Sequence, residues 1–585
     1  MIPIAKPRTR RLTIVAQDPS VRVNGKILTT QVEVPAEEIA PGPRGYRVQV
    51  IDYDTSSGVL YQPIDYPTLQ RGSYVDPFAR DAAKNENDWI LTEPRFHQQN
   101  VYAIVMKTLA RFEFALGRRV SWGFRGHQIH IAPHAFADAN AFYSKEDQAL
   151  VFGYFKGTGG QIVFTCLSHD VVAHETTHAI LDGLRNRYTD PSSPEQAGFH
   201  EGFADVVALL SVFSLKTIVG TLLQPDFGKK KSLETDLIDS DSLKPERLQE
   251  SVLLGLADQM GAEMLGVRGD RAAALRRSVK LRTFEPGEVE KLEEFKEPHR
   301  RGEILVAAML NAFLYVWRAR IERLERGKQS GKLDLELVVE QGAEAADHLL
   351  TMAVRALDYA PPTDLQFSDY LSALITADKE LVPDDSKYHY RKILLRSFAK
   401  YGVEPASTNS DDGSWEGCGA QLTYDRSHFE SMMRDPDEVF RFVWENREAL
   451  KLHDQAYTKV ISVRPCLRIG PDGFALRETV AEYIQMMTLQ AQELEYFNPP
   501  IGKPEGLDAN REVTIYGGGA LIFDEYGRLK YQVYNRVDNA ARQTPRLKYL
   551  WKHGYFDDIS GTQNAFARLH LNRTLNLRTR TAEVF

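Results

Sequence analysis

Alternating apolar and polar positions, a pattern typical of short β-strands, dominate the first 165 residues. β-branched residues alternate with polar ones in LTIVAQ, VRVNGKILTTQVEV and YRVQVIDYD, and Asn-Gly and Pro-Gly-Pro turns separate these runs. Strand-like runs recur further on in SWGF, HQIHIAPH, ALVFGYF and QIVFTC. Between the two groups, apolar residues recur at helical spacing: Val101, Ile104, Val105, Leu109 and Phe112. We therefore expect a β-rich N-terminal lobe over residues 1–165 that contains one long helix.

Helical periodicity replaces this alternation after residue 165. The expected helices cover residues 168–187, 199–217, 245–266, 302–325, 336–358 and 387–401. The most apolar stretches, 204–223 and 304–317, are either interrupted by charged residues or too short to cross a bilayer. Residues 166–405 are thus predicted to form a mainly helical lobe with no membrane span.

A polar run, ASTNSDDGSWEGCG, follows this lobe and has the composition of a connector between folded units. After it, FALRETVAEYIQMMTLQAQEL is predicted to be a helix, and ALIFDEYGRLKYQVYNRV to be a hairpin that turns near residues 525–527. Residues 406–585 are therefore expected to form an additional α+β domain, and the sequence assigns it no role. The predicted fold class of the whole chain is α+β.

Charge and cysteine content narrow the range of partners and compartments. The net charge of -8 provides no broad cationic field, so a nucleic acid is not expected as a partner. The three cysteines, Cys166, Cys418 and Cys466, lie far apart in the sequence, and this spacing suggests neither a disulfide framework nor a thiolate zinc site. The basic N-terminus is not followed by an apolar run of signal-peptide length. We expect a reducing, cytoplasmic location, and export by a route other than Sec stays open.

The segment SHDVVAHETTHAILDGL contains the candidate metal ligands and the candidate general base. His174 and His178 are four residues apart in a run compatible with a helix, so both imidazoles lie on one face and can reach a single Zn²⁺ ion. Glu175 follows the first histidine, where it can take a proton from a water molecule that the metal has made acidic. The spacing alone is also found by chance, with both histidines packed as ordinary helix residues.

A catalytic zinc site needs a third protein ligand and an open fourth position. The segment AGFHEGFADVVALL offers Glu201 as that ligand, and Asp205, one turn later, can hold the free ring nitrogen of a ligand histidine. His200 is the competing third ligand. We favour Glu201 because it has the i,i+4 spacing to Asp205.

The two motifs together resemble those of the thermolysin-like gluzincin metallopeptidases. The resemblance rests on DVVAHETTHAILD at residues 170–182 and HEGFAD at residues 200–205, and further matches extend it over residues 90–405. It implies a two-lobed zincin fold with the HExxH helix at the base of a cleft. Members of this family are typically secreted with a propeptide, and neither feature is visible in this sequence.

The resemblance also implies roles for residues outside the two motifs. Tyr188 and His299 would donate hydrogen bonds to the oxyanion of a tetrahedral intermediate. Asn140 and Ala141, in Asn-Ala-Phe-Tyr, would lie on an edge strand that binds the substrate backbone by strand addition. Calcium is not carried over, because Val212 stands where the family has an acidic calcium ligand, and Asp170 alone is better explained as a first-turn acid.

The sequence therefore predicts a zinc endopeptidase that acts on peptides or proteins through activated water. Two alternatives remain open at this point. The chain could keep the metal and serve as a non-catalytic binding or scaffold protein, or it could be a zinc hydrolase of a non-peptide amide.

Overall fold

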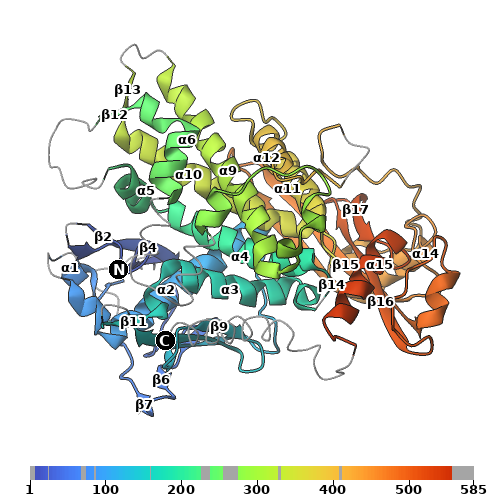
Figure 1. Cartoon of the computed structure of the whole chain (residues 1–585), viewed down its shortest axis with the longest axis horizontal. Coiled ribbons are helices and arrows are strands. Elements are labelled where there is room, and N and C mark those ends of the chain that lie inside the picture. The colour runs from blue at the N-terminus through green and yellow to red at the C-terminus, as the bar shows by residue number, and fades with distance from the viewer. Residues whose placement is uncertain are drawn as a thin grey trace, which may run out of the picture.

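The computed structural model describes residues 7–23, 25–66, 74–82, 84, 87–157, 160–190, 192–224, 237–254, 275–326, 331–406 and 411–556 (Figure 1). These residues form a mixed α+β protein, as the sequence predicts. Strands and one long helix make up the N-terminal part, helices the middle, and an antiparallel sheet with flanking helices the C-terminal part.

The N-terminal part is organised around a five-stranded sheet. The order β11-β10-β8-β5 is extended by β9, which pairs with β10. The pairs β10/β8 and β8/β5 are parallel, and β9 and β11 run antiparallel to β10. The five-stranded sheet consists of β5 (Val48–Val50), β8 (Ile129–Phe136), β9 (Ala141–Ser144), β10 (Ala149–Lys156) and β11 (Ile162–Phe164). Three two-stranded sheets pair β1 (Thr9–Val15) with β4 (Thr29–Pro35), β2 (Arg22–Val23) with β3 (Lys26–Ile27), and β6 (Tyr53–Asp54) with β7 (Val59–Leu60).

The expected long helix is α2 (Pro94–Leu116), and it is buried along most of its length. Glu93 caps its N-terminus and Gly117, with φ of 67°, ends it in the left-handed conformation that favours glycine. The short helix α1 (Ala79–Ala82) precedes it. The expected strand SWGF is wrong: it lies outside the strands, and Trp122 instead buries its ring and donates from Nε1 to the Arg47 carbonyl oxygen at 3.2 Å.

Helices fill the middle of the chain, and each of the six predicted ranges contains helix. They are α3 (His169–Leu184), α4 (Pro194–Phe213), α5 (Lys216–Leu223), α6 (Pro245–Leu248), α9 (Pro298–Glu325), α10 (Leu335–Arg355), α11 (Phe367–Leu381) and α12 (Tyr390–Ala399), with the small strands β12 (Leu237–Asp239) and β13 (Lys332–Asp334) between them. Of the helix expected over 245–266, α6 and a π-helical turn (Gln249–Leu254) are seen, and residues 255–266 lie outside the described residues.

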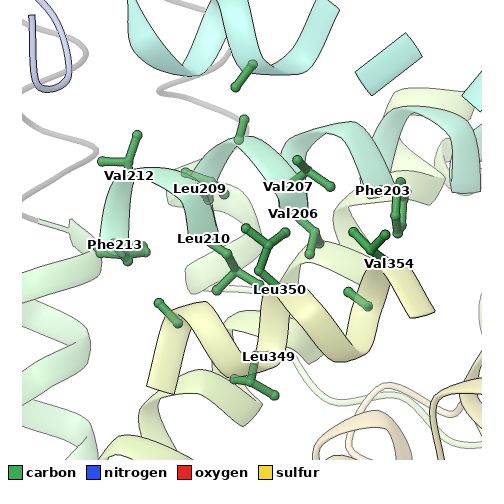
Figure 2. Close-up of a cluster of buried hydrophobic side chains, with 14 of the residues drawn as sticks. Phe203, Val206, Val207, Leu209, Leu210, Val212, Phe213, Leu349, Leu350 and Val354 are labelled. Atoms are coloured by element: carbon green, nitrogen blue, oxygen red, sulfur yellow. The ribbon is translucent and has the colours of Figure 1, made fainter. Parts of the chain in front are cut away.

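Helices α4 and α10 form the centre of the apolar core. Figure 2 shows Phe203, Val206 and Leu210 of α4 facing Leu350 and Val354 of α10. All five side chains are almost inaccessible to solvent. On its other side α4 packs against α3 and α9, so the core fixes the helices that carry the motifs.

Helix α9 is long and apolar enough to span a membrane by length and composition, and the bent pair α4 and α5 passes the same test when counted as one span. In α9, 78% of the most apolar window is buried inside the protein. Burial of this kind is typical of a core helix, so the apolar character of α9 is weak evidence for membrane insertion.

The C-terminal part is a four-stranded antiparallel sheet in the order β14-β15-β16-β17. Its strands are β14 (Tyr457–Ile469), β15 (Ala475–Gln490), β16 (Glu512–Phe523) and β17 (Leu529–Asn535), and its helices are α13 (Phe429–Met432), α14 (Pro436–Glu445) and α15 (Ala540–Lys552). The predicted hairpin is confirmed as β16 and β17, with Gly527 at φ of 78° in the turn.

The helix expected in residues 474–494 is wrong, because this segment forms strand β15. Residues 478–485 are all buried, since Val480 faces the main core while Ala481 and Tyr483 face a separate cluster on the other side of the sheet. A strand with two buried faces loses the alternation that identifies strands in a sequence.

Buried ion pairs join this sheet to the helical part. Arg468 of β14 pairs with Asp358 and with Glu478 of β15, and Asp358 also accepts two hydrogen bonds from Arg118, at 2.5 and 2.6 Å. Burial opposes the charged form of Asp358, but the two arginines outweigh it and lower its pKa. The C-terminal sheet is therefore held against the helices by charges that are buried together.

Candidate metal centre

Helix α3 places His174 and His178 on one face, as their spacing predicts. The ring centroids are 4.5 Å apart, the rings are perpendicular, and the two Nε2 atoms approach to 2.8 Å. Both side chains are almost fully buried. Thr176 and Thr177 donate their hydroxyl hydrogens to Val172 O and Ala173 O, so the polar residues of this buried helix bond within it. The two imidazoles are thus held with one nitrogen each directed to a common point.

Helix α4 brings Glu201 to the same point. Its carboxylate oxygens lie 3.6 Å from His174 Nε2 and 3.8 Å from His178 Nε2. Donor atoms of the three residues all lie within 4.8 Å of one another, which is the arrangement of a three-ligand metal site. Helix α4 begins at Pro194, where the Ser193 hydroxyl oxygen accepts a hydrogen bond from the Gln196 amide.

Asp205 and His200 lie next to this trio in different ways. Asp205 Oδ1 is 2.7 Å from His174 Nδ1, the ring nitrogen that faces away from the cluster. His200, the competing ligand, lays its ring parallel to that of His178, with centroids 4.7 Å apart and an angle of 17° between the planes. Of the groups of described residues whose donor atoms are close enough to share an ion, the one that contains His174 and His178 has Glu201, not His200, as its third member.

Glu175 is 1% exposed and follows His174 on α3. His299 approaches from the start of α9, with Nε2 3.5 Å from Glu201 Oε2 and Nδ1 2.6 Å from Glu297 Oε1. Burial disfavours the charged form of Glu297, but the His299 hydrogen bond and charge outweigh it and lower the pKa of Glu297. The carboxylate of Glu297 also caps α9 by accepting from the Arg300 amide at 2.8 Å. One residue therefore caps the helix and orients the histidine.

Close contact between glycines brings α9 to α4. A Cβ atom on Gly302 would lie 2.8 Å from Gly198 O, and one on Gly202 would lie 2.7 Å from Gly302 O. Side chains would force the helices apart at this crossing. Gly202 follows Glu201, and Gly302 lies one helical turn after His299, so the contact sets the distance between these two site residues.

Tyr188, the expected oxyanion donor, directs its hydroxyl group to a backbone carbonyl. It lies in a short 3-10 helix (Asn186–Thr189), where it is 2% exposed and packs edge-on against Phe199. Its hydroxyl group donates to the Pro361 carbonyl oxygen at 2.7 Å. Burial raises the pKa of this hydroxyl above the ordinary tyrosine value. The hydroxyl group is thus engaged by a backbone carbonyl, and the oxyanion-donor role of Tyr188 stays a prediction.

Ala141 begins β9 and Asn140 precedes it; the strand pairs with β10 and with no other described strand. Asn140 Oδ1 accepts from the Ala141 amide at 2.9 Å. The strand is tied to α3, because the Tyr143 hydroxyl and Lys145 Nζ both donate to Asp182, each at 2.9 Å. The predicted strand is therefore an edge strand, anchored to the helix that carries the histidines.

Sequence reasoning missed Glu297, Asp182 and the glycine contact. Glu297 had a local signal, because an acidic residue before a proline is a common helix start. Asp182 and the glycines act through contacts between elements far apart in the chain, which leave no such signal. In comparisons with known proteins, no family model matches the chain and no curated protein matches it.

Proposed function

We propose that this chain is a zinc-dependent endopeptidase whose metal is held by His174, His178 and Glu201. The observation that carries the proposal is the convergence of three buried donor atoms from two helices, with Asp205 on the far nitrogen of one ligand. A buried carboxylate beside two imidazoles is the donor set of catalytic zinc sites that keep a fourth position open. The donors present therefore fit zinc.

When bound, zinc supplies Lewis acid chemistry, in which a carbonyl group is polarised and a water molecule becomes more acidic. The proton of that water needs an acceptor that is close to the metal but is not one of its ligands. Glu175 fits this role because it is buried, adjacent to His174 on α3, and ionisable. Glu175 takes the proton from the attacking water and passes it to the leaving amine.

His299 is the donor best placed for the oxyanion. Its Nδ1 is held by Glu297 and its Nε2 lies at the edge of the cluster. An imidazole oriented in this way can stabilise a charge that develops near Glu201 without first reorganising. Because the Tyr188 hydroxyl group donates to Pro361 O, we assign the oxyanion-donor role to His299 only.

The substrate backbone is assigned to the edge strand β9. An extended peptide that adds to a strand edge is bound through its main chain, which allows a peptidase to accept varied sequences. The anchoring of β9 to α3 through Asp182 keeps this edge at a fixed distance from the histidines. In the proposed two-lobed arrangement the N-terminal sheet is one lobe and helices α4 to α12 are the other. The position of α3 between β9 and α4 supports it (Figure 1).

The test combines metal analysis with an assay on a mixed peptide library. Purified protein is expected to contain zinc and to cleave peptides in a way that chelators abolish. Glu175→Gln is expected to keep its zinc and lose roughly 10²- to 10⁴-fold in kcat, the usual contribution of a general base. Glu505→Gln, which changes an exposed carboxylate in the C-terminal part, serves as the matched control and should be fully active.

Other outcomes discriminate among the alternatives. Zinc without cleavage of any peptide would favour a binding or scaffold protein, and cleavage only of non-peptide amides would favour the third hypothesis. Normal peptide hydrolysis by Glu175→Gln would show that the assigned base is wrong.

A further inference from the structure

A second group of side chains that could hold a metal ion lies on elements that precede the HExxH helix in the chain. His97 comes from α2, His134 from β8, and Cys166 from the 3-10 helix η2 (Thr165–Leu167) that follows β11. One donor atom of each lies within 4.8 Å of the others. The three residues are 1%, 1% and 0% exposed, so the donor atoms are shielded from water.

The two imidazoles are oriented as ligand histidines are. His97 Nδ1 and His134 Nε2 face each other at 2.7 Å. The far nitrogens are both engaged: His97 Nε2 contacts the Ile90 carbonyl oxygen at 2.7 Å, and His134 Nδ1 contacts Asp52 Oδ1 at 2.8 Å. A backbone carbonyl and a carboxylate are the usual partners of the non-coordinating nitrogen in metal sites, where they fix the tautomer and the ring direction.

The surroundings hold these partners in place. Asp52 accepts a further hydrogen bond from Gln98 Nε2 at 2.9 Å, and the backbone carbonyl of Cys166 accepts one from Asn100 Nδ2 at 2.8 Å. The Phe164 ring covers both imidazoles, with centroid distances of 4.8 Å to His97 and 5.2 Å to His134. The cluster is therefore preorganised by buried amides and enclosed by an aromatic ring.

Charge balance favours a cation between the three donors. If each imidazole donates its far N–H, to Ile90 O and Asp52, both near nitrogens are left as acceptors that face each other. Two facing acceptors need either an additional proton or a metal ion between them. A divalent ion held by all three residues would be balanced by the Asp52 carboxylate and the Cys166 thiolate.

We propose that His97, His134 and Cys166 bind a second transition-metal ion of the zinc class. Imidazole and thiolate donors select zinc or copper over calcium and magnesium. Binding deprotonates the thiol and places the ion between the sulfur and the two ring nitrogens, with the proton released to solvent. The enclosed position makes this a structural site, independent of the proposed peptidase chemistry.

Its position suggests what the ion would stabilise. Cys166 lies three residues before the first residue of α3, whereas His97 belongs to helix α2 and His134 to strand β8 of the N-terminal sheet. An ion held by all three would join the start of the HExxH helix to the N-terminal sheet. The sequence does not predict this site, because the two histidines are 37 residues apart and no second cysteine lies near Cys166 in the sequence.

Cobalt provides a probe that distinguishes the two sites. A thiolate bound to Co²⁺ gives an intense charge-transfer absorption in the near ultraviolet, whereas the site of His174, His178 and Glu201 contains no sulfur. Protein produced in minimal medium with Co²⁺ as the supplied metal allows the ion to enter as the chain folds. We expect two cobalt ions per chain and the thiolate band in the full-length protein as isolated.

Variants assign the band and the second ion. Cys166→Ser should lose the band and one of the two ions, and its Tm should fall. Cys466→Ser, which changes another buried thiol, should keep both. His178→Ala should lose the other ion and keep the band. A failure of the proposed peptidase site can therefore be distinguished from a failure of the second metal site.

Absence of a thiolate band from the wild-type protein would overturn the proposal, and this measurement does not depend on any variant folding. A band that persists in Cys166→Ser would overturn it as well. Either result would leave His97, His134 and Asp52 as a hydrogen-bonded chain that shares a proton.

Discussion

Asp205 Oδ1 lies 2.7 Å from His174 Nδ1, while the Nε2 atom of the same ring faces the cluster. The carboxylate therefore lies beside one ring nitrogen and leaves the other directed toward the cluster, where it is available to a metal. Asp205→Ala is expected to weaken zinc binding by about 10- to 100-fold, because the ring loses both its orientation and some of its basicity. Competition with a chromophoric chelator measures the change.

Asp205→Asn separates the two contributions. Its amide oxygen can still face the ring nitrogen but carries no charge, so the zinc affinity of this variant should fall between those of the wild type and the alanine variant. If all three proteins bound zinc equally well, Asp205 would have no part in holding the ligand histidine.

Tyr188→Phe tests a residue that the structure and the family resemblance assign differently. Because the hydroxyl group donates to Pro361 O, its removal leaves a buried carbonyl oxygen without that donor, at a cost of about 1 to 3 kcal/mol in unfolding free energy. The kcat of the folded variant should stay within a few-fold of the wild type. A donor to the oxyanion would instead contribute roughly 10²- to 10³-fold. Denaturant unfolding and steady-state kinetics on the same preparation distinguish the two roles.

The sequence could predict the proposed metal ligands because their spacing within each helix is local. The i,i+4 spacing of His174 and His178 puts both rings on one helix face whatever the rest of the fold does. Glu201 and Asp205 have the same i,i+4 spacing on the next helix, so they also share one face. The approach of His299 depends instead on how α9 crosses α4, and only the family resemblance indicated it.

The features that the sequence did not predict correctly depend instead on contacts between segments that are far apart in the chain. Strand β15 was taken for a helix because both of its faces are buried, by helices on one side and by α14 on the other. The cluster of His97, His134 and Cys166 was missed because three separate elements each supply one donor. The hydrogen bond from Tyr188 to Pro361 was not predicted either, because a position carried over by resemblance does not reveal which carbonyl lies within reach.

Asp358 connects the stability of the chain to pH. Its pKa is lowered in the folded protein, and in the unfolded chain it is near 4. The charged carboxylate therefore stabilises the fold fully above about pH 4, and this contribution is lost as the pH falls further. Asp358→Asn, which leaves Arg118 and Arg468 buried without their shared anion, should lower the unfolding free energy at pH 7 by about 3 to 5 kcal/mol.

The difference between wild type and Asp358→Asn should then shrink between pH 4 and pH 2. Urea unfolding of both proteins across this range measures it, and subtraction removes the effect of other carboxylates. A difference that stayed constant down to pH 2 would mean that the charge of Asp358 is not what stabilises this interface.

Gly302→Ala tests whether the crossing of α4 and α9 positions the site. In an isolated helix the change would be favourable by about 1 kcal/mol, because alanine has the higher helix propensity. Here the new Cβ would meet Gly198 O at 2.8 Å and Gly202 N at 3.0 Å, both backbone atoms that cannot move alone. Displacement of α9 should lower the unfolding free energy by about 1 to 3 kcal/mol. It should also move His299 away from Glu201, so kcat is expected to fall while zinc content is kept. Gly419→Ala, where a Cβ meets nothing within 4 Å, is the control.

A Gly302→Ala variant that was as stable and active as the wild type would show that the helices adjust to the added methyl group. The glycine contact would then not set the distance between His299 and Glu201.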